Sequence, residues 1–133
     1  MKVDNKRDFN SDPFNQYLGL TLEETRQDFA RVKLQIGATT PTGINISVHG
    51  GVLATITDMA AVTAVFASMR DDDIPGGTAD LQISYLRHAH GNWLEAKANV
   101  LKKGKQLATI QVEITNNERT LCALGRVLYA FKR

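Results

Sequence analysis

The chain has 133 residues, and its 16 basic and 14 acidic residues give a formal charge of +2. That length suits one domain, expected over residues 1–133 with residues 1–12 as a flexible N-terminal segment. Because the basic residues are interleaved with acidic ones, nucleic acid is a poor candidate partner. The single cysteine, Cys122, excludes an internal disulfide, and we expect it to be an inert strand residue. The N-terminus shows no apolar stretch typical of a secretory signal, so we expect a cytoplasmic protein.

Alternating apolar and polar residues predict two strands in the first part of the chain. Residues 29–37 alternate strictly, as a half-buried strand does, and residues 20–27 are expected to form its hairpin partner. A loop containing Pro41 and Gly43 follows. The face of the second strand that is expected to be buried consists of Ala30, Val32, Leu34 and Ile36.

A long helix is predicted to begin at Gly50 and to stop at Arg70, before three successive aspartates that would oppose the dipole of a helix C-terminus. The segment 50–69 is apolar on nearly every side if helical. One sheet of a small monomer cannot cover such a helix, so a second copy of the chain is implied. A membrane span is disfavoured because the segment contains Asp58 and four hydroxyl residues and precedes alternating strands.

Four further strands are predicted after Thr78, which opens the first of them. Hairpin-type turns are expected at Gly91-Asn92, at residues 102–105 and at Asn116-Asn117. Two strands, a buried helix and four strands are typical of an α+β fold with an antiparallel sheet. The apolar positions of the four strands are Ala79, Leu81, Ile83 and Tyr85; Leu94, Ala96, Ala98 and Val100; Ala108, Ile110, Val112 and Ile114; and Leu121, Ala123, Val127 and Tyr129.

Asp58 is the first candidate functional residue, because it is the only formal charge between Lys33 and Arg70. Burying a lone carboxylate costs several kcal/mol unless it is paired or used. A general base or nucleophile is therefore one interpretation, and a structural carboxylate bound to backbone donors is the other.

The glycine pair at the start of the helix is the second candidate. Gly50 and Gly51 would leave unpaired N–H groups at the positive end of the helix dipole, which suits a developing oxyanion. A plain helix entry is the alternative. Asp58 lies about 12 Å further along the axis at ~1.5 Å per residue, so both can serve one carbonyl only if they come from different subunits.

Three other polar features have two interpretations each. Thr78 could orient a carboxylate or a water, or be a surface residue at a strand end. His49 could act as acid, base or orienting group, or make a structural hydrogen bond in a loop. Lys102, Lys103 and Lys105 form a basic turn that could bind an anion or only confer solubility.

A metal site is not expected. His88 and His90 share a face of a strand end, but no further ligands cluster with them in the sequence. The aspartate run at residues 71–73 is interpreted as a solvated loop and not as a cation site.

Four features together resemble the hotdog-fold acyl-CoA thioesterases of the phenylacetate-pathway (PaaI-like) type: HGGV at residues 49–52, the acid seven positions after Gly51, TADLQISYLR at residues 78–87 and KKGKQLA at residues 102–108. The likeness extends from about Phe14 to Phe131. Many members have an asparagine six residues before the histidine and a glycine three before it, and here those positions hold Gly43 and Ile46.

The resemblance implies a hotdog fold, in which about six antiparallel strands wrap a long central helix, assembled as a dimer or a dimer of dimers. Asp58 would be the nucleophile or general base, and the Gly50 amide of the other subunit would polarise the thioester carbonyl. Thr78 would place the acid or its water. The substrate would be an acyl-CoA, with no metal or organic cofactor.

The same resemblance implies a set of substrate-binding residues. The CoA chain would follow the segment after the third strand and the basic turn, and two helix residues would line the acyl pocket. The expected residues are Asn45, His49, Gly51, Met59, Val62, Tyr85, Leu86, Arg87, His88, His90, Lys102, Lys103, Gly104 and Lys105.

Two rival functions remain open on the same fold. A non-catalytic acyl-CoA binding or sensing module is favoured by the altered loop at Gly43 and Ile46, and disfavoured by the presence of Asp58. A dehydratase acting on hydroxyacyl thioesters would pair a histidine with an acid, here His49 with Asp58, but the surrounding motif matches thioesterases better.

Overall fold

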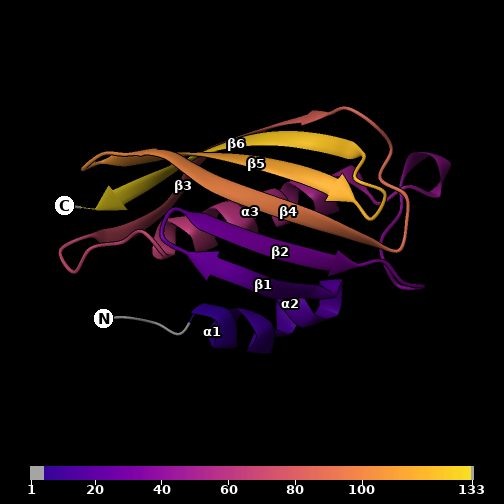
Figure 1. The fold of residues 1–133 in the computed structure, drawn as a ribbon, viewed down its shortest axis with the longest axis horizontal. Coiled ribbons are helices and arrows are strands. Elements are labelled where there is room, and N and C mark those ends of the chain that lie inside the picture. Colours follow the sequence, from indigo (N-terminus) through magenta and orange to yellow (C-terminus); the bar gives the residue numbers. More distant parts are fainter. Residues whose placement is uncertain (1–4, 133) are drawn as a thin grey trace.

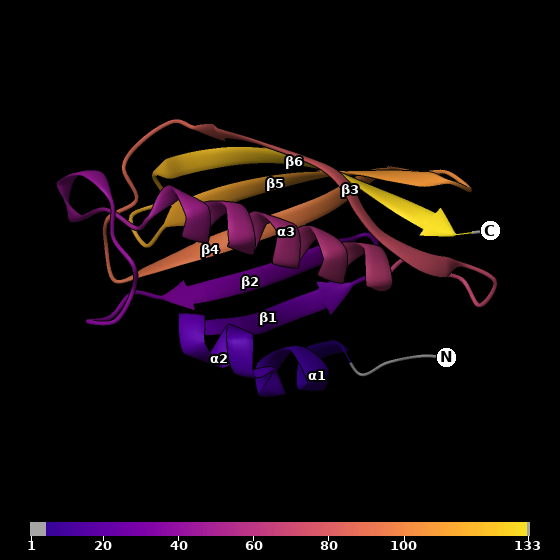
Figure 2. The same cartoon turned by 180° about the vertical axis from the view of Figure 1, so that it is seen from behind.

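One six-stranded antiparallel sheet wraps around one long helix in the computed structural model, which describes residues 5–132 (Figure 1). Seen from behind, α3 lies along the inner face of the sheet, and α1 and α2 lie beside β1 (Figure 2). The elements are α1 (Asn5–Ser11), α2 (Pro13–Leu18), β1 (Leu20–Arg26), β2 (Phe29–Gln35), the 3-10 turn η1 (Ile44–Ile46), α3 (Gly50–Phe66), β3 (Ile74–Tyr85), β4 (Trp93–Lys103), β5 (Leu107–Asn116) and β6 (Leu121–Lys132).

The strand order is β1-β2-β4-β5-β6-β3, so β3 lies at an edge of the sheet and pairs with β6. The turn predicted at Gly91-Asn92 is therefore wrong as a hairpin, because β3 and β4 are not neighbours and the segment between them crosses the end of the sheet. The other two turns join neighbouring strands, as predicted. The β4–β5 turn is shorter than expected, since Lys102 and Lys103 still belong to β4.

The alternation predicted from the sequence is confirmed in the central strands, whose inward residues form the core. Val32, Leu34, Ala96, Ile110 and Val112 are all at most 1% exposed. Helix α3 packs across β2, β4 and β5. Gly125 on β6 allows this close approach, because a Cβ there would lie 2.5 Å from Cγ2 of Thr57.

Helix α3 ends at Phe66 and not at Arg70. Ala67 is the C-cap, and the backbone N–H of Arg70 donates to the Asp73 carboxylate within the loop that follows. Ser68 donates to Asp28 of the β1–β2 turn, which ties this loop to the sheet. The three aspartates lie in the loop, as predicted.

The edge strand β3 and one stripe of α3 are incompletely covered in a single chain. β3 begins at Ile74, so Thr78 is its fifth residue and does not open the strand. No residue of β3 is fully buried, whereas the inner residues of β5 are. On α3, Asp58, Met59 and Val62 are only partly buried, and Phe66 is 37% exposed. This surface is the part of the fold that a second copy could cover.

The N-terminal segment is more ordered than the sequence indicated. Residues 5–11 form α1, where a flexible segment was expected, and residues 1–4 lie outside the described part. Phe9 is buried, and Asn10 Oδ1 accepts a hydrogen bond from the Leu22 backbone of β1. Asp12 caps α2, Pro13 occupies its first turn and Gly19 ends it in the left-handed conformation.

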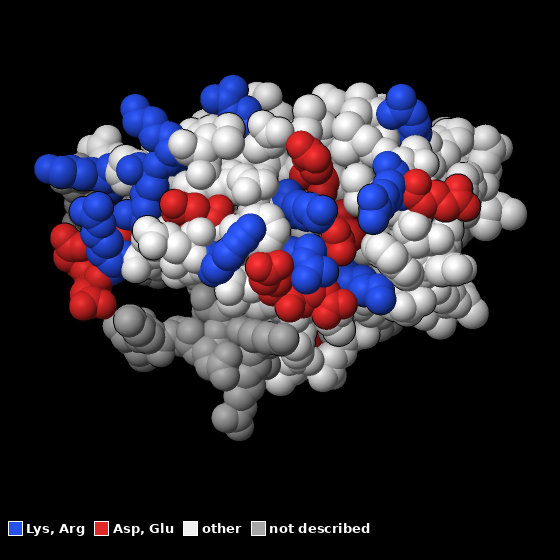
Figure 3. All heavy atoms as spheres, in the orientation of Figure 1, with Lys and Arg blue, Asp and Glu red and all other residues white. Residues whose placement is uncertain are grey.

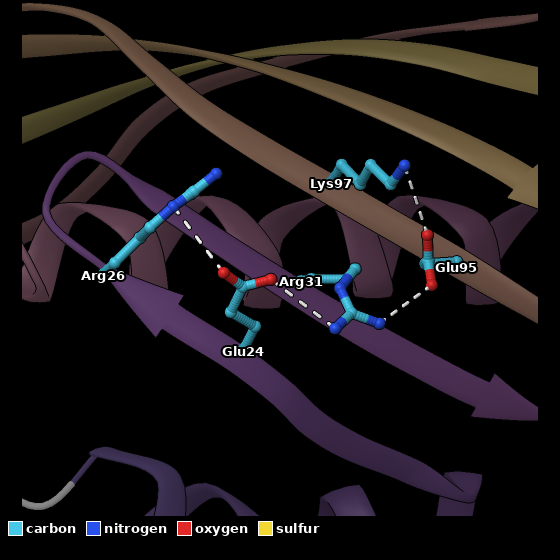
Figure 4. Close-up of polar contacts among 5 residues, drawn as sticks. All are labelled: Glu24, Arg26, Arg31, Glu95 and Lys97. Carbon is cyan, nitrogen blue, oxygen red and sulfur yellow. Dashed lines mark hydrogen bonds and ion pairs between the residues drawn. The ribbon is translucent and has the colours of Figure 1, made fainter.

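The outer face of the sheet carries charges of both signs (Figure 3). A ladder of side chains crosses β1, β2 and β4, in which Arg31 binds Glu24 at 3.5 Å and Glu95 at 3.2 Å (Figure 4). Arg26 and Lys97 extend it at the two ends. The pairs at the two ends of the ladder are exposed and contribute about 0–1 kcal/mol each, whereas the central Arg31–Glu95 pair is partly buried.

Candidate active site

The acid of the candidate site is held by a hydrogen bond between α3 and β3. Thr78 Oγ1 donates to Asp58 Oδ1 at 2.6 Å. Bulges on both sides of Thr78 break the β3–β6 register, and Thr78 itself remains directly opposite Tyr129. The sequence indicated a buried carboxylate, but Asp58 is only partly buried. The reason is that the stripe of α3 that carries Asp58 faces away from the centre of the sheet.

The second part of the candidate site is the N-terminus of α3. His49 is the N-cap residue, and its Nδ1 accepts a hydrogen bond from the Gly51 amide at 2.9 Å. This geometry places the ring proton on Nε2. The Gly50 amide donates to no residue in the described part of the chain, so it is the N–H group that remains available to an oxyanion.

A cavity of about 730 Å³ opens next to Gly50. Tyr85 closes one side, since its hydroxyl donates to the Gly50 carbonyl at 2.9 Å. Six residues that the sequence assigned to the site line this cavity: His49, Gly50, Tyr85, Leu86, Arg87 and His88. The sequence-predicted oxyanion donor and the segment expected to bind CoA are thus adjacent within one chain.

Asn45 does not line this cavity, but its side chain contacts His88, which does. Its Nδ2 lies 3.4 Å from His88 Nδ1, so the amide points toward the end of β3. His90 stacks edge-on against His88, and the His90 carbonyl accepts a hydrogen bond from Asn116. The Asn45 amide is therefore engaged with His88, and Gly43, at the position where many family members have an asparagine, has no side-chain donor.

The loop before α3 has an unusual backbone at Ile46. Asn45 and Ile46 have φ values of 56° and 58°, although the second is β-branched. Ile46 is also 80% exposed. The loop is closed by hydrogen bonds from Ser47 to the Ile44 carbonyl and from Gly43 to the Ser47 carbonyl. Position 46 thus keeps the conformation that suits the glycine of many family members.

Replacing Ile46 with glycine is expected to stabilise the protein. The left-handed conformation costs a non-glycine residue about 1–2 kcal/mol, and the greater freedom of unfolded glycine offsets about 0.4–1 kcal/mol of the gain. We expect the Tm to rise by roughly 2 °C, measured by thermal unfolding. Ile44→Gly is the control, because Ile44 is 75% exposed and has a negative φ. That variant should lower the Tm, and equal shifts would contradict the strain at Ile46.

The basic turn lies in a different cavity, of about 700 Å³, lined by Lys102, Lys103, Gly104, Lys105 and Lys132. Lys103 is already paired there, since its Nζ lies 2.6 Å from Asp73 Oδ2. This hydrogen bond, followed by that from the Arg70 backbone, holds the pKa of Asp73 below its usual value. Lys102 and Lys105 are exposed. Lys and Arg side chains gather at the end of the molecule that holds this turn (Figure 3).

The two cavities lie at opposite ends of β3. Asp73 directly precedes this 12-residue strand, and Tyr85 is its last residue. The two ends of the strand, Ile74 and Tyr85, lie about 36 Å apart at ~3.3 Å per residue. One CoA molecule cannot follow both segments within one chain, so they can share a substrate only across a subunit interface. Gly50 and Asp58 lie eight residues apart on α3, about 12 Å along its axis at ~1.5 Å per residue. They too can act on one substrate carbonyl only if they come from different subunits.

Two further features of the described residues bear on function. They contain no group of three or more His, Cys, Asp and Glu side chains arranged to hold a metal ion. No helix among them is long and apolar enough to cross a membrane.

The fold and the polar groups define a class of protein, a hotdog-fold protein with a carboxylate on the central helix and a free amide at the helix start. A family model described as "Thioesterase superfamily" matches residues 46–123. The chain is 30% identical over 134 residues to the medium/long-chain acyl-CoA thioesterase YigI of Salmonella typhimurium, covering 88% of this chain and 84% of that protein. It is 37% identical over 82 residues to human acyl-coenzyme A thioesterase 13, covering 60% of this chain and 57% of that protein.

Solved structures agree with this result. The Escherichia coli PaaI protein from the phenylacetic acid degradation operon superposes with a TM-score of 0.82 at 25% identity, over 96% of this chain and 89% of that one. Zebra fish thioesterase superfamily member 2 gives a TM-score of 0.83 at 27% identity, over 96% of this chain and 95% of that one. The chain belongs to the thioesterase superfamily, and the predicted hotdog fold is confirmed.

Proposed function

We propose that this thioester hydrolase cleaves an acyl-CoA to a free acid and CoA, with Asp58 as the reacting carboxylate. The observation that carries the proposal is the hydrogen bond from Thr78 to Asp58 Oδ1, which leaves the second carboxylate oxygen, Oδ2, without a hydrogen-bond partner among residues 5–132 as described. Asp58 either attacks the acyl carbon or removes a proton from the attacking water. If Asp58 attacks, the C–S bond breaks as the CoA thiolate leaves, and water then hydrolyses the acyl–Asp58 anhydride to the free acid and the regenerated carboxylate. If Asp58 acts as a base, water adds to the acyl carbon, the C–S bond breaks and the proton taken by Asp58 passes to the leaving CoA thiolate.

The oxyanion donor in this proposal is the Gly50 amide of a second copy. Within one chain Gly50 and Asp58 stand too far apart for one carbonyl, and the half-covered stripe of α3 beside the β3 edge provides a surface for a partner. A site shared between two subunits can bring the Gly50 amide of one and the Asp58 carboxylate of the other to the same carbonyl without a change in the conformation of either chain. The active form is then a dimer or a larger assembly built from such dimers.

The acyl group is proposed to lie against the partly buried residues Met59 and Val62, next to Asp58 on the same side of α3. Apolar side chains at this position suit an apolar acyl chain. Because YigI carries a medium/long-chain name, medium- and long-chain acyl-CoA esters are the first candidates.

The test is release of CoA from a series of acyl-CoA esters, detected with a thiol-reactive dye. We expect turnover of at least one medium- or long-chain ester, and sedimentation should show a dimer or larger species at the assay concentration. A fully active monomer would contradict the shared site.

A non-catalytic acyl-CoA binding module is the second candidate. Gly43 lacks a side-chain donor, and the Asn45 amide contacts His88, so one carbonyl contact available to many family members is missing. This function predicts acyl-CoA binding without CoA release in the same assay. The dehydratase alternative is weaker, because His49 already uses Nδ1 to cap α3 and starts the helix that carries Asp58.

The basic turn is expected to contribute to CoA binding through Lys102 and Lys105, since Lys103 is neutralised by Asp73. Lys102→Glu with Lys105→Glu should raise KM for acyl-CoA several-fold, because CoA phosphates would meet negative charge. The effect on an acyl-pantetheine without the nucleotide should be much smaller, and the defect should shrink at high salt.

A double reversal on the outer sheet face, Lys33→Glu with Lys97→Glu, is the matched control for net charge. It should leave KM for acyl-CoA unchanged. Equal KM increases in the two double variants would show an effect of overall charge. No increase in either would place the nucleotide elsewhere, for example at Arg87 and His90.

A further inference from the structure

Tyr85 connects the proposed oxyanion donor to the sheet. It is the last residue of β3, and its hydroxyl donates to the Gly50 carbonyl at 2.9 Å. The ring also lies close to this glycine, since a Cβ atom on Gly50 would stand 3.3 Å from two of the ring carbons. The family resemblance implied that Tyr85 contacts the CoA chain, but its hydroxyl is already engaged by the start of α3.

The hydrogen bond from Tyr85 restrains one particular peptide group. The Gly50 carbonyl and the Gly51 amide belong to the same planar peptide. Its carbonyl accepts from Tyr85, and its amide donates to His49 Nδ1 at 2.9 Å. Both polar atoms of this peptide are therefore bound by side chains, one from the helix N-cap and one from β3.

The preceding peptide group carries the free donor. It joins His49 to Gly50, and its carbonyl accepts from the amides of Val52 at 2.9 Å and Leu53 at 3.2 Å. Its N–H is the Gly50 amide that is proposed to meet the oxyanion. Only the φ and ψ angles of Gly50 separate the two peptide planes, so the direction of the free N–H relative to β3 depends on how firmly the second plane is held.

A helix that begins with two glycines needs such a restraint. Glycine has no Cβ and the greatest backbone freedom, and the ends of helices open at little cost in free energy. The hydrogen bonds through His49 come from the N-cap itself, whereas the bond from Tyr85 comes from the sheet. Tyr85 therefore fixes the start of α3 relative to β3.

The backbone of Tyr85 is firmly anchored, although its side chain is not buried. The strand pairs with β6 up to this residue, and the next two amides, those of Leu86 and Arg87, both donate to the Cys122 carbonyl, at 2.8 and 3.1 Å. The whole residue is 55% exposed. The ring is thus held less by the core than by its contacts with the start of α3.

We propose that Tyr85 is a positioning residue for the oxyanion donor: its hydroxyl holds the Gly50–Gly51 peptide so that the Gly50 amide points at the carbonyl of the substrate. This inference rests on the proposed function, because it concerns the donor of that reaction. β3 then positions both polar groups that α3 supplies, since Thr78 on the same strand donates to Asp58.

Tyr85→Phe tests the inference, because it removes only the hydroxyl and keeps the ring beside Gly50. Amide hydrogen exchange is measured by NMR on the protein without substrate. The Gly51 amide should exchange about 3- to 10-fold faster than in the unmodified protein, because its peptide loses one of two side-chain partners. The amides of Ile56 and Thr57, further along α3, should keep their rates. An unchanged Gly51 rate, or an equal acceleration at Ile56 and Thr57, overturns the inference.

The kinetics of the same variant distinguish positioning from substrate contact. We expect kcat to fall about 3- to 10-fold with KM for acyl-CoA unchanged, because the donor is needed for a charge that develops only in the transition state. A Tyr85 that bound the CoA chain would raise KM and leave kcat unchanged. An unchanged kcat in an active enzyme, with or without a higher KM, overturns the inference.

Tyr17→Phe is the matched control, since Tyr17 lies on α2 and is 74% exposed. It should change neither the exchange of the Gly51 amide nor kcat.

The exchange measurement needs no substrate, so it separates this inference from the proposed function. Faster Gly51 exchange in Tyr85→Phe, together with an unmodified protein that cleaves no acyl-CoA, would support the hold of Tyr85 on the peptide and refute the hydrolase proposal. An unchanged Gly51 rate in an active enzyme would do the reverse.

Discussion

Asp58→Asn is expected to lower turnover of the best acyl-CoA substrate by at least ~100-fold while the protein remains folded and assembled. Asparagine keeps the size of the side chain and an Oδ1 atom that can still accept the hydrogen bond from Thr78. It lacks the negative charge needed to attack the acyl carbon or to take a proton from water. The measurement is CoA release under saturating substrate, with the Tm recorded on the same samples.

Asp80→Asn is the matched control for Asp58→Asn. Asp80 lies on the same strand as Thr78, is exposed and is bound only loosely by Gln82, at 3.4 Å. Its substitution changes the charge equally and should leave turnover near that of the unmodified protein. If Asp58→Asn also turns over substrate at that rate, Asp58 has only a structural role.

Gly50→Pro is expected to reduce kcat by about 100- to 1,000-fold, the usual cost of losing an oxyanion donor. Gly50 is the first residue of α3, the helix position where proline is best tolerated. His49, with φ −55° and ψ 135°, already has the backbone that a residue before proline requires. The substitution therefore removes one N–H group from a helix that should still form.

Gly50→Ala separates the loss of the N–H from the added bulk. Either substitution adds a Cβ atom about 3.3 Å from the ring of Tyr85. The Tyr85 side chain can shift by a few tenths of an ångström to make room for it. Alanine keeps the amide, so its kcat should fall far less than that of proline. Equal losses in the two variants would assign the defect to Tyr85 and not to a missing donor.

The same two variants test whether the site is shared. Subunits with Asp58→Asn and subunits with Gly50→Pro are each inactive alone, but a mixed dimer combines one intact Asp58 with one intact Gly50 at one of its sites. Random mixing of equal amounts should recover about a quarter of the unmodified activity. No recovery in a verified mixed dimer would place both groups in one chain's site.

The position of β3 shows how far local sequence patterns determine this fold. Alternation predicted the presence of all six strands, although not the start of β3, and the Gly50-Gly51 pair predicted the start of α3, because these signals lie in residues close together along the chain. The pairing of β3 with β6 and the crossover at Gly91-Asn92 depend on contacts between distant segments. Helix α3 ends at Phe66, and just beyond it Ser68 binds Asp28, 40 residues away along the chain.

The sequence by itself determined the acid, the glycine pair and the family pattern, because a lone carboxylate in an apolar helix and an HGG run are local features. The tertiary structure alone decided which of these residues meet. In the fold, Thr78 donates a hydrogen bond to Asp58, the Gly51 amide donates to His49, and Lys103 forms an ion pair with Asp73. It also placed Tyr129 directly opposite Thr78, which no spacing along the chain could indicate, because β6 and β3 are neighbours only in the folded sheet.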